Sequence, residues 1–61
     1  MRNIRTALVG LNQDYQDVIV WYYLEDFPIA KVAEMSGRTE SATRVLIHRA
    51  LSSLKDKMHQ S

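Results

Sequence analysis

Residues that interrupt helices occur at only three places in this chain: Gly10, Pro28 and Gly37. Between them, apolar side chains recur three or four positions apart, which is the spacing of an amphipathic helix. No segment long enough to form a strand alternates apolar and polar residues. The pattern therefore predicts an all-α fold of four short helices. We expect these helices over residues 3–9, 13–25, 28–35 and 40–58.

Capping residues predict where these helices begin and end. Gly10 lies where a C-cap is expected, and Asn12 can cap the N-terminus of the second helix. Pro28 suits the first turn of the third helix, where its missing N–H costs nothing. Gly37 can adopt a positive φ, and Thr39 can cap the last helix. The residues expected to face the core in the first three helices are Ile4, Ala7, Leu8, Tyr15, Val18, Ile19, Tyr22, Ile29, Val32, Ala33 and Met35.

The middle of the second helix carries the weakest helical signal. Residues 18–20 are β-branched and residues 21–23 are aromatic, and both kinds of residue favour strands. We expect Trp21, Tyr22 and Tyr23 to lie mostly in the core, because aromatic side chains bury the largest area per residue. Any of the three left exposed would be a candidate partner surface, since aromatic residues are enriched in interfaces.

Length and composition exclude several classes of protein. With 61 residues and no cysteine, the chain depends on one small core and has no disulfide framework. Two histidines are too few for a zinc site held by protein alone, and we expect no cofactor. There is no apolar run of the roughly 20 residues that span a membrane, and no signal peptide at the N-terminus. We expect a soluble, cytoplasmic protein, with residues 1–61 forming one domain excised from a longer chain.

Enzymatic activity is also not expected. The sequence offers no pair of carboxylates, no nucleophile beside a base and no glycine-rich loop that could hold a phosphate; Gly37 stands alone.

Positive charge gathers in the last third of the chain. Residues 1–37 carry three basic and five acidic side chains, whereas residues 38–61 carry five basic and two acidic ones. A basic C-terminal helix is consistent with a surface that faces phosphates. It is equally consistent with a solvated helix whose cations interact with the helix dipole, and Lys55, Lys57 and His59 fit that description.

The last helix has two different faces when its residues are placed 100° apart on a wheel. One face is a core stripe made of Thr43, Ile47, Ala50, Leu51, Leu54 and Met58, flanked by Leu46. The opposite face contains Ser41, Ala42, Val45, His48, Arg49 and Ser52, with Arg44 at its edge. Small residues let a helix approach base pairs, arginine can bond guanine, and an apolar group can touch a thymine methyl. The outward face therefore suits the major groove of DNA, although a solvated face with one stray valine has the same pattern.

The spacing of Ala33, Gly37 and Leu46 is typical of a helix-turn-helix. A small residue lets the two helices cross closely, glycine allows the turn, and an apolar residue on the second helix fixes their angle. In this motif the second helix enters the major groove while the first lies across the DNA backbone.

An ordered set of motifs extends over residues 4–56. It comprises Ala7-Leu8-Val9-Gly10-Leu11, YQDVIVWYYLED at 15–26, Lys31-Val32-Ala33-Glu34, Gly37, RVLIHRA at 44–50 and Leu54. In this order the motifs resemble region four of bacterial sigma factors, and most of all the extracytoplasmic-function group. The resemblance implies a winged-helix-like bundle of three to four helices that binds the minus-thirty-five promoter element. It also implies attachment to the β flap of RNA polymerase and, commonly, masking by an anti-sigma factor.

The resemblance assigns roles to individual residues. Groove-reading positions correspond to Arg44, Val45, His48 and Arg49, and the backbone-contacting end of the recognition helix corresponds to Arg38 and Ser41. The chain also departs from the usual pattern. Asn12 replaces a proline, Tyr22 an arginine, Ser41-Ala42-Thr43 the usual Gly-Thr-Val, and Arg38 an apolar residue. The promoter preference of the family therefore does not transfer.

Each of these residues also has an ordinary structural explanation. Arg49 could pair with an acid at the surface, and Arg44 could lie along the core with its charge in water. His48 could be a polar residue without a specific role, and Val45 could contact a protein partner. The same helices could thus serve as a protein-interaction module that docks on an anti-sigma factor or the β flap, with little DNA binding of its own.

Overall fold

The computed structural model describes residues 4–59. Its elements are α1 (Ile4–Val9), α2 (Gln13–Ile19), a π-helical turn η1 (Val20–Leu24), α3 (Ile29–Ser36) and α4 (Glu40–His59). No strand occurs among these residues. The predicted all-α order is confirmed, and the helix boundaries differ from the predicted ones by at most one residue when α2 and η1 are taken together as the second helix. Residue 3 and the side chain of Ile4, both assigned to the first helix, lie outside the described part.

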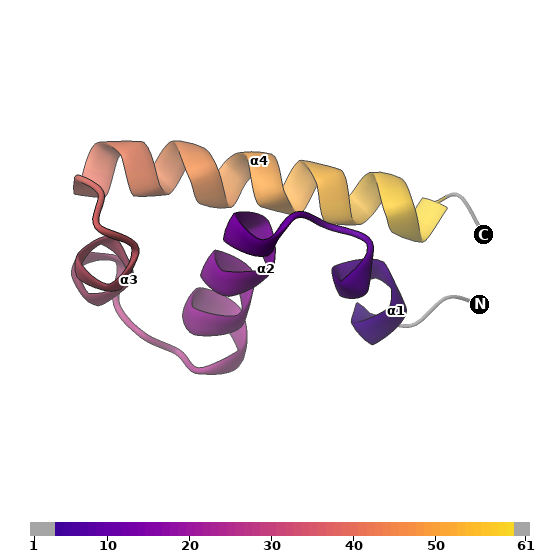
Figure 1. Cartoon of the computed structure of the whole chain (residues 1–61), viewed down its shortest axis with the longest axis horizontal. Coiled ribbons are helices and arrows are strands. Elements are labelled where there is room, and N and C mark those ends of the chain that lie inside the picture. The colour runs from indigo at the N-terminus through magenta and orange to yellow at the C-terminus, as the bar shows by residue number, and fades with distance from the viewer. Residues whose placement is uncertain (1–3, 60–61) are drawn as a thin grey trace.

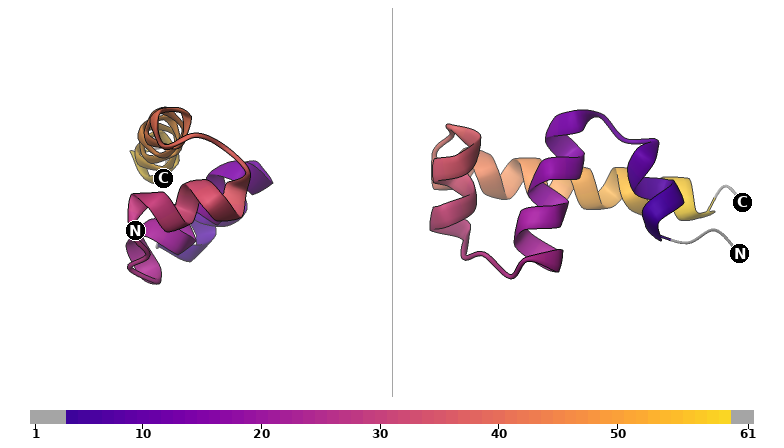
Figure 2. Two further views of the ribbon diagram at one scale, coloured as in Figure 1. Left: turned by 90° about the vertical axis from the view of Figure 1, so that its left-hand side faces the viewer. Right: turned by 60° about the horizontal axis from the view of Figure 1, so that its bottom comes forward.

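Helix α4 is the longest element, and the other helices contact it along its length (Figure 1). Helices α1, α2 and α3 all lie on the same side of α4, and the two further views agree (Figure 2). The opposite side of α4 is left uncovered by the described elements. Helix α4 therefore has one face buried in the core and an opposite face that is exposed.

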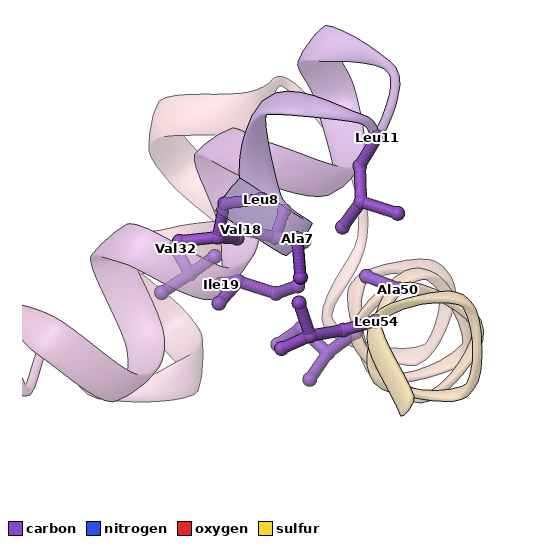
Figure 3. Packing of buried hydrophobic residues seen from close by; sticks show 9 residues of the cluster. Ala7, Leu8, Leu11, Val18, Ile19, Val32, Ala50 and Leu54 are labelled. Carbon is purple, nitrogen blue, oxygen red and sulfur yellow. The ribbon is translucent and has the colours of Figure 1, made fainter. Parts of the chain in front are cut away.

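The core lies where the short helices meet α4. Figure 3 shows Leu54 pointing from α4 toward Ala7 and Ile19. The buried apolar residues are Ala7, Leu8, Leu11, Val18, Ile19, Val32, Ala33, Ile47, Ala50 and Leu54. Apart from Leu11, which lies between α1 and α2, these residues come from α1, α2, α3 and α4, so every α-helix contributes to one small core. Full burial of one large apolar side chain stabilises a fold by about 1.5–3 kcal/mol.

The predicted core stripe of α4 is confirmed except at its edges. Thr43, Ile47, Ala50 and Leu54 are buried, and Leu51 is partly buried. Met58 is 40% exposed, so its assignment to the core was wrong. Met58 lies in the last turn of α4, one residue before the helix ends at His59.

Most predicted caps are confirmed. The N–H of Tyr15 donates to Oδ1 of Asn12 at 2.9 Å, which caps α2. Pro28 is the N-cap of α3, one position before the first turn in which it was expected. Gly10 follows α1, but its φ is not positive. A Cβ atom there would lie 2.9 Å from Cδ of Lys57, so Gly10 lets α1 approach α4 closely.

The segment with the weakest helical signal is helical but irregular. Its end winds as a π-helix, in which the N–H of Glu25 donates to the carbonyl oxygen of Val20 at 2.8 Å. Asp26 then reverses the chain with a φ of 58°, which is unusual for a residue with a side chain. Trp21 and Tyr22 are half-buried, but Tyr23 is 47% exposed, so its assignment to the core was wrong.

Candidate nucleic-acid interface

The turn between α3 and α4 has the geometry that the helix-turn-helix spacing predicted. Gly37 has a φ of 70°, and the N–H of Arg38 donates back to the carbonyl oxygen of Ala33 at 3.0 Å. Ala33 and Val32 are buried beneath α4, so small and branched residues let the two helices cross closely. Left-handed backbone costs a residue with a side chain about 1–2 kcal/mol, which glycine avoids.

The first turn of α4 is secured by two threonines. Oγ1 of Thr39 accepts from the N–H of Ala42 at 3.1 Å, which confirms Thr39 as a capping residue. Thr43 is fully buried, and its hydroxyl donates to the carbonyl oxygen of Thr39 at 2.7 Å. Thr43 stands where the motif usually has valine, and its hydroxyl is hydrogen-bonded. This bond is a second link between the turn and α4.

The outward face of α4 is exposed as predicted. Its members are Ser41, Ala42, Val45, His48, Arg49 and Ser52, with Arg44 beside them. Val45 is 52% exposed. The first part of this face carries serine and alanine, so nothing bulky stops a flat surface from approaching the helix backbone. These residues are exposed, whereas Thr43, Ile47, Ala50 and Leu54 on the other face of α4 are buried.

The three arginines near this face have different surroundings. Arg49 has no acidic partner among residues 4–59. The alternative in which Arg49 pairs with an acid at the surface is therefore not what the structure shows. Nη2 of Arg44 lies 3.5 Å from Oε1 of Glu40, one turn back on the same helix. Nη2 of Arg38 lies 3.2 Å from Oδ2 of Asp14 in α2. This ion pair ties Arg38, which lies in the turn before α4, to α2.

A groove runs along one flank of α4. It has a volume of about 330 Å³ and is lined by Tyr22, Tyr23, Ile29, Arg44, Ile47, His48 and Leu51. The rings of Tyr22 and Tyr23 meet edge to face, with their centroids 4.9 Å apart. Arg44 and His48 therefore border both the groove and the outward face.

Sequence reasoning missed this groove and the partner of Arg38. The wheel assigned Ile47 and Leu51 to the core, and it had no means of placing Tyr22 and Tyr23 beside them. The one available signal was the run of aromatic residues at 21–23, which was noted as a partner surface if exposed. Lys57 was assigned to the solvated end, yet it is partly buried against α1, whereas Lys55 and His59 are exposed.

Comparison with known protein families decides what this arrangement is. A family model described as sigma-70, region 4 matches residues 1–54. The chain belongs to this family. Region 4 domains are helical, DNA-binding and non-enzymatic, and they act in transcription initiation. The family and the exposed second helix of the helix-turn-helix agree on one kind of ligand, which is double-stranded DNA.

Other comparisons add no further relatives. Neither a search of curated proteins nor a search of solved structures found a significant match for this region 4 domain. Within residues 4–59, no helix is long and apolar enough to cross a bilayer. No cluster of three or more histidine or acidic side chains in that range could hold a metal ion.

Proposed function

We propose that this region 4 domain recognises the minus-thirty-five element of promoter DNA through the outward face of α4, as part of the RNA polymerase holoenzyme in the cytoplasm. The observation that carries the proposal is the uncovered face of α4, where small residues precede an arginine without an acidic partner among the described residues. A helix with small residues can enter the major groove, and arginine can form a bidentate contact with guanine.

In this proposal each residue of the outward face makes a different contact with DNA. Arg49 contacts a base or a phosphate, Val45 touches a thymine methyl, and His48 and Arg44 contact the DNA from the edge of the face. Ser41 contacts the backbone at the start of α4. The acidic Asp56 and the apolar rim at Met58 limit the DNA contact to the first three turns of α4, because a carboxylate repels phosphate.

The domain alone should bind DNA weakly. A few phosphate contacts give an affinity that falls steeply with salt, and one small module buries little surface. Attachment to the β flap of RNA polymerase would raise the effective concentration at the promoter. We propose that the groove beside α4, whose lining includes the 47% exposed Tyr23, supplies that attachment surface together with Leu24, the next residue in the chain, which is 56% exposed. The motif order supports placement in the extracytoplasmic-function group.

The second candidate function is protein docking without DNA recognition. The same groove favours it, because its apolar floor and exposed aromatic rim are typical of interfaces. An anti-sigma factor seated there would touch Arg44 and His48, and it would thereby mask the edge of the outward face. In that case the domain would bind a protein tightly and would form no salt-dependent DNA complex.

The test is binding to a duplex library over a series of salt concentrations, with the wild type beside Arg49→Ala. We expect enrichment of a few sequences, affinity that falls with salt, and relaxed selection at one base position in the variant, at a cost of about 1–3 kcal/mol. Lys55→Ala is the matched control, since it removes one exposed charge from the same helix beyond the outward face. If no sequence is enriched even at low salt, the docking function is the better one.

A further inference from the structure

We infer that Asp14 is a positioning residue for DNA recognition, because it clamps Arg38 and thereby holds the turn from which α4 projects. The inference rests on the proposed DNA-binding function and deepens it. It concerns a residue in the first turn of α2, which lies outside the helix-turn-helix. It also concerns Arg38, which lies in the turn between α3 and α4.

The contact joins two parts of the chain that are 24 positions apart. Nη2 of Arg38 donates to Oδ2 of Asp14 at 3.2 Å, and Nη1 reaches the carbonyl oxygen of Ser36 at 3.4 Å. The side chains of Arg38 and Asp14 are 35% and 63% exposed. The stem of Arg38 thus lies against the protein and its charge meets the carboxylate at the surface, as is usual for a long cationic side chain.

The clamp continues into α4 through the next residue. Thr39 caps α4 through Ala42, and its carbonyl oxygen accepts from the buried hydroxyl of Thr43. On the other side, Asn12 caps α2 just before Asp14. The ion pair therefore joins the first turn of α2 to the residue just before the cap of α4, where the proposed DNA contacts begin.

Arg38 is exposed and cannot hold the turn by burying its charge, so its side chain ties the turn to α2 through the ion pair with Asp14. A turn held by an exposed ion pair opens more readily, and DNA affinity falls in proportion to the fraction of molecules with α4 correctly placed. Asp14 thus favours DNA binding, although its negative charge by itself would oppose it.

Asp17 provides a matched control on the same helix. It lies one turn after Asp14 and lines the same surface hollow, but its carboxylate accepts from the side chain of Gln13 at 2.8 Å. Asp17→Asn removes the same charge at nearly the same place and leaves the clamp intact. It therefore separates the clamp from a general electrostatic effect on DNA.

The experiment is a double-mutant cycle on the 61-residue chain with Asp14→Asn, Arg38→Gln and their combination, beside Asp17→Asn. DNA affinity is measured with the best duplex from the library, at a temperature at which circular dichroism shows every variant folded. We expect each single change to weaken binding about two- to fivefold, and the combination to weaken it no further. Asp17→Asn should not weaken binding.

The salt dependence separates a clamp from a phosphate contact. Loss of one phosphate contact lowers the slope of log affinity against log salt by about 0.9, whereas loss of the clamp leaves the slope nearly unchanged. If Arg38→Gln lowers the slope and Asp14→Asn strengthens binding, Arg38 contacts phosphate as the resemblance implies and the inference is wrong. It is also wrong if the affinities of all variants equal that of the wild type. A wild type that binds no duplex overturns the proposed function, and this inference with it.

Discussion

The α3–turn–α4 unit and the α2–η1 segment pack on the same core but are built differently. In the first, glycine occupies the one left-handed position, and threonine caps the helix that follows. In the second, the helix ends in a π turn, and Asp26 takes a left-handed conformation that favours glycine. The unit that would meet DNA is thus locally unstrained, whereas the segment that lines the groove is irregular. Irregular helix turns are frequent at functional sites, which agrees with a docking role for the groove.

The comparison depends on a core that both segments share. We expect Ile47→Ala to destabilise the protein by about 2–5 kcal/mol, because Ile47 is buried in α4 and a cavity would remain. That loss approaches the whole stability of a domain of this size, so most of the helical circular dichroism signal should disappear. Tyr23→Ala in η1 is the control, and we expect it to unfold at nearly the wild-type temperature. Equal losses in the two variants would mean that the exposed tyrosine is a core residue after all.

The two glycines sharpen the contrast between backbone conformation and close packing. Gly37→Ala should cost about 1–2 kcal/mol, since alanine at a φ of 70° is strained although open space surrounds it. Gly10→Ala should cost less, because the new Cβ meets only the flexible side chain of Lys57. Chemical denaturation of both variants measures the difference. A larger loss at Gly10 would contradict the view that the turn before α4 needs glycine for its conformation.

Helices α2 and α4 each begin with a side-chain cap, so their first turns should be equally stable although α2 ends irregularly. We expect Thr39→Ala and Asn12→Ala each to lower the free energy of unfolding by about 1 kcal/mol, because each removes the acceptor of a backbone N–H. Thr39→Ser is the control, since it keeps the hydroxyl. If Thr39→Ala were neutral while Asn12→Ala was not, the buried hydroxyl of Thr43 would be the more important link to α4.

The smallest expected effect concerns the strained end of the second segment. Asp26→Gly should raise the free energy of unfolding by less than about 1 kcal/mol, because glycine adopts a φ of 58° without strain but also gains freedom in the unfolded chain. Asp26→Asn, which tolerates the same conformation, separates this effect from the loss of charge. A clear destabilisation by glycine would show that Asp26 contributes a contact that outweighs its strain.

Much of the fold could be predicted from local spacing, because helices are specified by residues three and four positions apart. The caps at Asn12 and Thr39, the turn at Gly37 and the exposure of Val45, His48 and Arg49 all follow from such patterns. The family resemblance was confirmed as well, over residues 1–54. What these residues contact on DNA remains a prediction.

Tertiary structure alone decided which side chains from distant segments would meet. A wheel drawn for α4 cannot bring Tyr22 and Tyr23 beside Leu51, because these tyrosines belong to the π turn η1 and reach the groove only through the packing of separate elements. It also cannot pair Arg38 with Asp14, since the sequence records only that both are charged. The amphipathic periods of this sequence determine which face of each helix is buried. Which faces contact one another depends on the packing of all the helices at once. That packing formed the groove beside α4 and the ion pair between Arg38 and Asp14.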